Sequence, residues 1–297
     1  MMGNRFSVST VVTVLAAFSI GAVVAVGVTG SASQAPDPSA RPAQTPDGRP
    51  NFNGVWQALN EAHWDLEAHE ALPGMVMQEG VYPYEYARVP AAPVVALGAA
   101  AGVPGSMGVV QGDGRIPYTP EALAIKEENG ANWIDRDPEL KCYLPGTPRA
   151  MYMPYPFQIV QGADEITIAY EFSSATRIIH LRDHAEPAID SWMGWSNGRW
   201  EGDTLVVDVT GFNGQTWFDR AGNFHSNALH VVERYTPVTP YHLDYEVTIE
   251  DPSVFERPWT MRMPLYRRMD AGAQVMDFRC LEFVEPLLLG SLSNPVP

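Results

Sequence analysis

The sequence predicts an all-β fold, an antiparallel barrel or sandwich, from two patterns in its second half. Apolar and polar residues alternate in DEITIAYEF (residues 164–172) and in HLDYEVTIE (residues 242–250), as expected for strands that bury one face. Turn-forming pairs such as Asn197–Gly198 and Asn213–Gly214 separate such segments. Short strands with frequent turns, and no parallel βαβ pattern, favour an antiparallel meander that closes on itself.

Five further segments are strand candidates: TRIIHLR (176–182), DTLVVDV (203–209), ALHVVERY (228–235), WTMRMPLY (259–266) and QVMDFRCLEF (274–283). Residues 72–120 are rich in proline, glycine and alanine, which predicts a long irregular insertion in the N-terminal part of the fold. One short helix is predicted over TPEALAIKEENG (119–130), where Thr119 caps the helix, Pro120 opens it and Gly130 stops it.

The N-terminal residues predict export from the cytoplasm. Arg5 precedes an uncharged apolar run over residues 11–28, and the small residues of GSASQA (30–35) follow, as in a signal peptide cleaved after Ser33. The run is also close to the ~20 residues that span a bilayer, so an uncleaved N-terminal anchor is the alternative. In either case the rest of the chain is expected in the periplasm or outside the cell.

A proline-rich stretch divides the rest of the chain. Residues 34–50 contain few apolar side chains and cannot bury enough surface to order themselves, so we interpret them as a linker. The predicted organisation is a signal peptide or anchor over 1–33, a linker over 34–50 and a single β-barrel-like domain over 51–297.

Charge restricts the partners of this domain. The formal net charge is −16, and no run of lysine or arginine interleaves the aromatic residues. Nucleic acid and anionic membrane surfaces, which both need a basic face, are therefore excluded as main partners. Apart from a possible N-terminal anchor, no membrane contact is expected, and the sequence does not indicate an oligomeric state.

The cysteines predict a disulfide bond. Cys142 and Cys280 are the only two in the chain. An isolated pair in an exported protein is typical of a bridge, which over so long a loop is nominally worth ~4–5 kcal/mol in the chain-entropy model. The alternative is two free, buried thiols.

The strongest functional signal lies in FDRAGNFHSNALHVVERY (218–235), where acid–base side chains crowd beside an apolar strand. Asp219 and His225 flank a predicted turn and are close enough in sequence to pair. An imidazole oriented by a carboxylate suits general acid–base catalysis, because histidine titrates near neutral pH. We therefore predict His225 as the general base or acid and Asp219 as its orienting partner. The alternative is structural, with Asp219 and Ser226 satisfying backbone amides.

Four more residues complete the predicted catalytic set. Alternation places His230 and Arg234 on one face of the strand after the turn, with His230 as a second proton-transfer group. Arg220 or Arg234 would hold developing negative charge. Tyr152, in the aromatic segment 141–158, is an additional donor.

No cofactor is expected, because the chain has no glycine-rich phosphate loop and no GxSxG, HExxH or CxxC motif. A mononuclear metal site of Asp219, His225 and His230 is an alternative that requires a bend between the two histidines. His180 and His184 are four residues apart, which would bring two ligands together on a helix, but the segment is a predicted strand.

Aromatic residues indicate the kind of partner. They gather in residues 141–158 and around the central turns, where the chain carries Trp192, Trp195, Trp200 and Trp217. Such residues line pockets for apolar or ring-shaped ligands, so a small apolar or aromatic molecule is the predicted partner. Ordinary core packing is the alternative explanation for them.

A longer stretch supports a family resemblance. NGRWEGDTLVVDVTGFNGQTWFDRAGNFHSNALHVVERY (197–235), together with residues 141–161 and 247–261, resembles an uncharacterised family of exported bacterial proteins. The resemblance covers about residues 51–280 and implies a lipocalin-like antiparallel barrel, without implying an activity.

A second, shorter resemblance lies at the start of the domain. Gly54-x-Trp56 is similar to the GxW motif on the first strand of lipocalins, and Arg279 on a late strand would be the residue that packs on the tryptophan. The long insertion between Trp56 and Tyr143 departs from a compact lipocalin, which argues against a simple ligand carrier.

These observations predict an exported β-barrel enzyme that acts on a small, largely apolar molecule. It would use acid–base chemistry without an organic cofactor, as a lyase, hydratase, isomerase or hydrolase. A lipocalin-type binding protein for an apolar ligand and a metal-dependent enzyme are the two alternatives.

Overall fold

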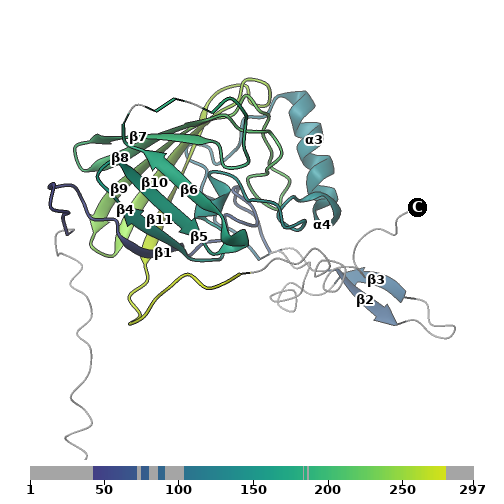
Figure 1. Cartoon of the computed structure of the whole chain (residues 1–297). Helices are drawn as coiled ribbons and strands as arrows, with labels where there is room; N and C mark the ends of the chain where they lie inside the picture. Colours follow the sequence, from purple (N-terminus) through teal and green to yellow (C-terminus); the bar gives the residue numbers. More distant parts are fainter. Residues whose placement is uncertain are drawn as a thin grey trace, which may run out of the picture. The chain divides into compact units, whose positions relative to one another are not determined.

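Nine strands close into a barrel in the computed structural model of the chain (Figure 1). The structure describes residues 43–71, 75–79, 86–90, 104–182, 184–185 and 187–278. The barrel strands are β1 (Gly54–Ala58), β4 (Phe157–Gln161), β5 (Glu165–Tyr170), β6 (Thr176–His180), β7 (Trp195–Glu201), β8 (Thr204–Thr210), β9 (His230–Thr239), β10 (His242–Glu250) and β11 (Trp259–Arg267). The predicted all-β barrel is confirmed.

The strands follow one another around the barrel in the order β1-β11-β10-β9-β8-β7-β6-β5-β4, and β4 pairs with β1 to close it. Neighbouring strands are antiparallel except for β6 and β7, which pair parallel through Ile179–Ser196 and His180–Asn197. The connection between β6 and β7 therefore has to cross from one end of the barrel to the other.

Alternation separates an inner from an outer face of the barrel wall, as the sequence predicted. On β9, Val231, Glu233 and Tyr235 are buried inside, whereas His230 and Arg234 lie on the outer face. His230 and Arg234 therefore share a face, as the sequence predicted, but this face points away from the barrel interior.

A buried polar cluster fills part of the barrel interior. The Glu233 carboxylate accepts hydrogen bonds from Arg177 Nη1 at 3.1 Å, from the Tyr235 hydroxyl at 3.0 Å and from the Tyr245 hydroxyl at 2.5 Å. Arg177 Nε donates to the Ser196 hydroxyl at 2.8 Å. Because these side chains satisfy one another, the ion pair is tolerated inside the barrel. They also occupy the space in which a lipocalin would hold its ligand.

At one end of the barrel, the segment that precedes β1 packs against β11. The Arg267 guanidinium of β11 lies 4.5 Å from the centre of the Trp56 ring of β1. The same guanidinium donates to the backbone carbonyls of Asn51 at 2.9 Å and Pro240 at 2.9 Å. The residue that packs on Trp56 is therefore Arg267; Arg279, which the sequence suggested, lies outside the described residues.

The insertion between β1 and β4 carries a 3-10 helix (Arg149–Met151), and a second one (Phe172–Ser174) joins β5 to β6; the insertion further holds two strands and two α-helices. They are the hairpin β2 (Met75–Glu79) and β3 (Tyr86–Pro90), the helix α3 (Pro120–Ala131) and the short helix α4 (Trp133–Arg136). Thr119 caps α3 by accepting the Ala122 N–H at 3.3 Å, with Pro120 at the first helical position. The predicted helix is confirmed, although α4 follows almost at once.

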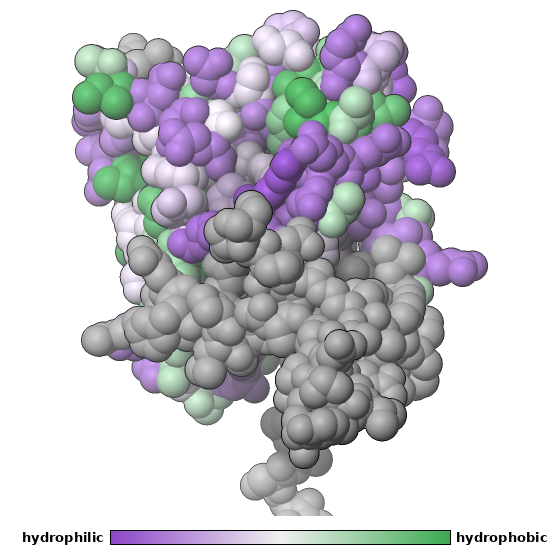
Figure 2. Space-filling model, turned by 90° about the vertical axis from the view of Figure 1, so that its right-hand side faces the viewer, coloured by the Kyte–Doolittle hydropathy of each residue, from purple (hydrophilic) through white to green (hydrophobic). Residues whose placement is uncertain are grey.

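Three long connections meet at the second end of the barrel: the insertion, the β8–β9 connection (211–229) and the β10–β11 connection (251–258). The Tyr118 hydroxyl of the insertion donates to Asn223 Oδ1 at 2.9 Å, and Asp251 accepts the Ser226 N–H at 2.6 Å. In Figure 2, which looks onto the side where α3 lies in Figure 1, hydrophilic residues predominate over the described surface.

Several predictions lie outside the described residues. These include the signal peptide or anchor, most of the linker, Cys280 and therefore the predicted bridge to Cys142. Within the described part of the chain, no helix is long and apolar enough to cross a membrane.

Candidate functional site

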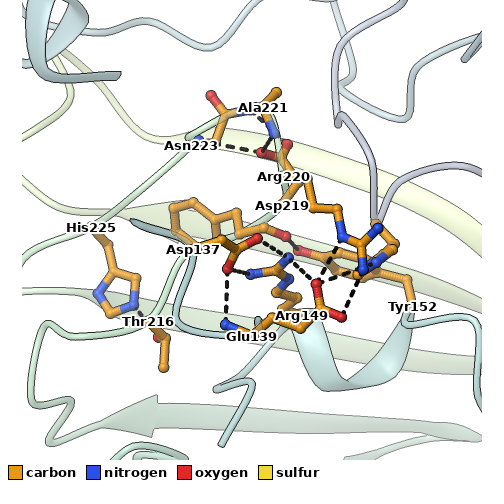
Figure 3. Close-up of polar contacts among 12 residues, drawn as sticks. Asp137, Glu139, Arg149, Tyr152, Thr216, Asp219, Arg220, Ala221, Asn223 and His225 are labelled. Carbon is orange, nitrogen blue, oxygen red and sulfur yellow. Dashed lines mark hydrogen bonds and ion pairs between the residues drawn. The ribbon is translucent and has the colours of Figure 1, made fainter. Parts of the chain in front are cut away.

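Asp219 holds together the turn at which the sequence placed the site. Its Oδ1 accepts the N–H groups of Ala221 at 3.0 Å and Asn223 at 3.2 Å. Its Oδ2 accepts the Leu66 N–H at 2.8 Å and Asn223 Nδ2 at 2.6 Å (Figure 3). Burial, reinforced by the nearby Asp65 carboxyl, raises the pKa of Asp219 to about 8, while the Asn223 side chain, the Leu66 N–H and Arg149 oppose that rise. With both oxygens occupied, Asp219 has no lone pair left for a histidine.

His225 forms two hydrogen bonds of its own, and neither is to Asp219. Its Nδ1 lies 2.7 Å from the Ser226 carbonyl oxygen, so Nδ1 carries the proton and donates. Its Nε2 then accepts from the Thr216 hydroxyl at 2.6 Å, on the side turned away from Asp219 (Figure 3). Burial lowers the pKa of His225, which keeps the ring neutral. The expected Asp219–His225 pair is not formed. Asp219 and Ser226 accept backbone N–H groups, as in the structural alternative, and His225 is buried.

His230 and Arg234 belong to another surface. His230 Nε2 lies 3.1 Å from Asp208 Oδ1, and Arg234 Nη1 donates to Glu201 Oε2 at 3.0 Å, both on the outer wall of the barrel. His225, in contrast, is buried in the β8–β9 connection. The proposed metal ligands are therefore apart, and no group of three possible ligands occurs among the residues that the structure describes.

Arg220 lies in a buried network of charges. Its Nε and Nη2 donate to the two carboxylate oxygens of Glu139 at 2.8 and 2.9 Å. Arg149 donates to both oxygens of Asp137 at 2.7 Å each and to Glu139 at 3.2 Å (Figure 3). Burial alone would raise the pKa of Glu139, but Arg220 and Arg149 outweigh it and lower that pKa. Two carboxylates and two guanidinium groups thus balance in charge.

Tyr152 contacts the β8–β9 connection next to Asp219. Its buried hydroxyl donates to the Phe218 carbonyl at 2.9 Å, directly before Asp219. Burial, and then the Asp219 carboxylate, raises the pKa of Tyr152. The hydroxyl therefore holds the β8–β9 connection in place and has already used its proton.

A cavity of about 330 Å³ lies beside Arg220. Its walls are formed by Trp64, Asp65, His69, Lys126, Glu127, Gly130, Trp133, Arg220 and Ala221. We call it the Trp64–Arg220 cavity. The Arg220 guanidinium carbon lies 4.3 Å from the ring centre of Trp64 and 5.3 Å from that of Trp133. Of the predicted site residues, only Arg220 lines this cavity.

Two acid–base side chains line the Trp64–Arg220 cavity. His69 Nδ1 lies 2.6 Å from the Glu70 carbonyl oxygen, so it donates its proton there. His69 Nε2 is buried without a hydrogen-bond partner among the described residues. Asp65 accepts the Glu67 N–H at 2.9 Å, and burial raises the pKa of this carboxyl although Lys126 and His69 lie close enough to lower it.

Hydrogen bonds that lead to the barrel hold the backbone of residues 65–69 in place. His69 exchanges two backbone hydrogen bonds of 3.0 Å with Ser106, and the Val109 N–H donates to the Leu66 carbonyl at 2.8 Å. The Val109 carbonyl in turn accepts the Arg262 N–H of β11 at 3.0 Å. The segment is thus attached to β11 on one side and to Asp219 on the other, which pre-positions its side chains.

Sequence reasoning missed Asp65 and His69. The stretch HWDLEAHE (63–70) holds more titratable groups for its length than residues 218–235, and this density was the signal that could have revealed them. It lies directly after the first strand, where nothing periodic marks an element. The cavity also needs Trp133 and Lys126, which only the folded insertion brings beside Arg220.

Comparison of the chain with models of protein families and with curated proteins finds no match. The resemblance to a family of exported bacterial proteins therefore stays a prediction.

Proposed function

We propose that this protein is an enzyme that performs acid–base chemistry on a small molecule bound in the Trp64–Arg220 cavity, with His69 as the proton-transfer group. The observation that carries the proposal is that one cavity is lined by His69, by Asp65, whose pKa is raised by burial, and by the cations Lys126 and Arg220. Acid–base and charged side chains gathered around one cavity are typical of a catalytic site.

The chemistry follows from the groups on the cavity wall. His69 accepts a proton from the substrate, and the electron pair of the broken bond moves onto a substrate oxygen. Arg220 and Lys126 line the same cavity and stabilise the resulting negative charge. The protonated His69 then returns the proton to another atom of the substrate. This order of proton transfers is suited to a lyase, hydratase or isomerase and needs no organic cofactor.

The two alternatives receive less support from the geometry. A carrier of the lipocalin type would hold its ligand inside the barrel, where Arg177, Glu233, Tyr235 and Tyr245 already meet. A metal-dependent enzyme needs converging ligands, and the described residues offer no group of three. We also propose that the enzyme is exported, on the strength of the N-terminal sequence alone.

Proton exchange tests the enzyme proposal before the substrate is identified. Small ring ketones, lactones and phenols are incubated with the protein in D₂O, and ¹H NMR follows loss of signal or formation of product. The wild type and His230→Gln, a histidine variant on the outer wall, are expected to catalyse the same exchange. His69→Gln is expected to lose it. Equal exchange by His69→Gln and wild type would refute the role of His69, and exchange by none of the proteins would refute the enzyme proposal.

A further inference from the structure

A second pocket lies at the end of the barrel where the segment before β1 packs against β11. It measures about 210 Å³ and shares no residue with the Trp64–Arg220 cavity. The segment before β1, β1 itself, the β9–β10 turn, β10 and β11 all contribute to its wall, through residues that include Asn51, Trp56, Pro240, Tyr241, Leu243 and Arg267. We call it the Trp56–Arg267 pocket.

Most of the wall of this pocket is apolar. Phe52, Trp56 and Leu243 line it, and each has an exposed fraction of only 1%. Pro237 and Pro240 add two apolar rings. A water molecule in the liquid takes about 30 Å³, so the space corresponds to roughly seven waters. The pocket therefore suits an apolar group of about four to six carbon atoms beside one polar group.

The charge of the pocket is positive. Among the described residues that line it, Arg267 is the only one with a charged side chain. The Trp64–Arg220 cavity, in contrast, has Asp65 and Glu127 on its wall beside the cations. The Trp56–Arg267 pocket is thus locally favourable for an anion, on a chain whose formal net charge is −16.

The Arg267 guanidinium has neutral hydrogen-bond partners. It donates to the backbone carbonyls of Asn51 and Pro240 at 2.9 Å each and to that of Asn53. The described residues give it no carboxylate partner, and burial lowers the pKa of Arg267 because nothing nearby offsets the desolvation of its charge. A guanidinium carries five N–H groups, so two of them have no partner in the described part of the chain.

The arginines of the two buried networks show what Arg267 lacks. Each of them donates to a carboxylate: Arg149 to Asp137, Arg177 to Glu233 and Arg220 to Glu139. A charge that is removed from water is normally paired in this way. Arg267 is only partly buried and lines a half-open pocket, so a dissolved anion can reach it and take the place of the missing carboxylate.

We propose that the Trp56–Arg267 pocket binds a small monocarboxylate with an apolar body, whose carboxylate accepts hydrogen bonds from Arg267 and whose body contacts Trp56 and Leu243. A carboxylate matches the planar set of donors on a guanidinium, and its single negative charge balances the single positive charge of the wall. A phosphate or sulfate would match the donors but not the apolar space. The inference goes beyond the proposed function and does not depend on it, because the pocket contains none of the residues proposed for catalysis.

Calorimetry of the full-length protein with isovalerate at pH 7 tests the proposal. We expect one molecule to bind per chain. Acetate has the same charge without the apolar body, and isovaleramide has the same body without the charge. Each should bind about tenfold more weakly or worse, as expected when the burial of several apolar carbons or a charge-assisted hydrogen bond is lost.

Two variants locate the site. Tyr241→Glu places a carboxylate on the pocket wall and keeps the backbone contacts of the turn, and Arg267→Gln removes the charge. Both should weaken isovalerate binding at least tenfold, whereas Arg268→Gln, at the neighbouring exposed arginine, is the matched control and should bind as the wild type does. Melting temperatures are recorded for all variants. If Arg267→Gln does not fold, Tyr241→Glu and the comparison with isovaleramide still decide the matter.

Three results would overturn the proposal. The first is the absence of isovalerate binding at millimolar concentration. The second is equal affinity for acetate or for isovaleramide, which would show that the pocket does not use the apolar body or the charge. The third is binding that a folded Tyr241→Glu leaves unchanged, in particular if Lys126→Gln abolishes it, because the carboxylate would then occupy the Trp64–Arg220 cavity instead.

Discussion

The Asp219 carboxylate accepts the backbone N–H of Leu66 at 2.8 Å, across 153 residues of sequence. This contact joins the β8–β9 connection to the segment that carries Asp65 and His69. Asp219 is fully buried, and its other hydrogen bonds also come from N–H donors. The residue predicted to orient a catalytic histidine therefore orients the backbone beside another histidine.

Replacing Asp219 by asparagine is expected to destabilise the protein by about 2–4 kcal/mol, because an amide nitrogen would face N–H donors that lose their acceptor. Urea unfolding at pH 7 measures the loss. Asp208→Asn is the matched control, since Asp208 is partly exposed on the outer wall and pairs with His230. Its loss should stay within about 1 kcal/mol. Equal losses for the two variants would show that Asp219 does not hold these segments together.

Arg220→Lys is expected to cost about 2–4 kcal/mol in unfolding free energy and to weaken binding in the Trp64–Arg220 cavity. A lysine cannot reproduce the two-point contact with Glu139 or the stacking on Trp64, so the buried carboxylate loses part of its compensation. The same substitution at Arg234, which meets Glu201 on the exposed wall, should change stability by less than about 0.5 kcal/mol. Urea unfolding and the proton-exchange assay in D₂O provide the two readouts.

Two buried histidines predict a loss of stability in mild acid. The pKa of His63 lies well below its ordinary value of 6.5 because of burial, and burial also lowers that of His225. The unfolded chain therefore binds protons that the folded chain does not, so this stability is complete above pH 6.5 and is lost as the pH falls from there. We expect the unfolding free energy to drop between pH 6.5 and 5 by up to about 1.4 kcal/mol per pH unit for each histidine.

His63→Phe isolates the larger effect. Among the described residues, neither ring nitrogen of His63 has a hydrogen-bond partner, although Nε2 lies 3.6 Å from Glu139 Oε2. An apolar ring of similar shape leaves no donor unsatisfied, so the variant should keep its stability at pH 7 and show a shallower pH dependence. Urea unfolding at several pH values tests this. An unchanged slope would mean that His63 is protonated in the folded state.

The barrel was predictable because period-two alternation is a local signal. On β9 it separated Val231 and Glu233 from His230 and Arg234 correctly, and the lipocalin-like GxW placed Trp56 on the first strand. The Thr119–Pro120 start of α3 was equally local. Each of these features depends only on residues within one element.

The site was not predictable in the same way. Asp219 and His225 are close in sequence, yet they do not pair. Asp219 accepts a hydrogen bond from the Leu66 N–H, and His225 accepts one from the Thr216 hydroxyl. A sequence pattern reveals neither partner. Asp65 and His69 become candidate site residues only because the fold places them in one cavity with Arg220, which lies about 150 residues away in the chain. Such competition between partners is a property of the folded molecule.

The interior ion pair provides the last prediction. Glu233 is the common acceptor for Arg177, Tyr235 and Tyr245, all buried. Glu233→Leu leaves the Arg177 charge without its carboxylate, which should cost about 3–5 kcal/mol. The double variant Glu233→Leu/Arg177→Met removes both charges and should recover most of this loss, so that the pair contributes more to specifying the barrel interior than to its net stability. Urea unfolding of both variants decides this; a double variant no more stable than Glu233→Leu would contradict it.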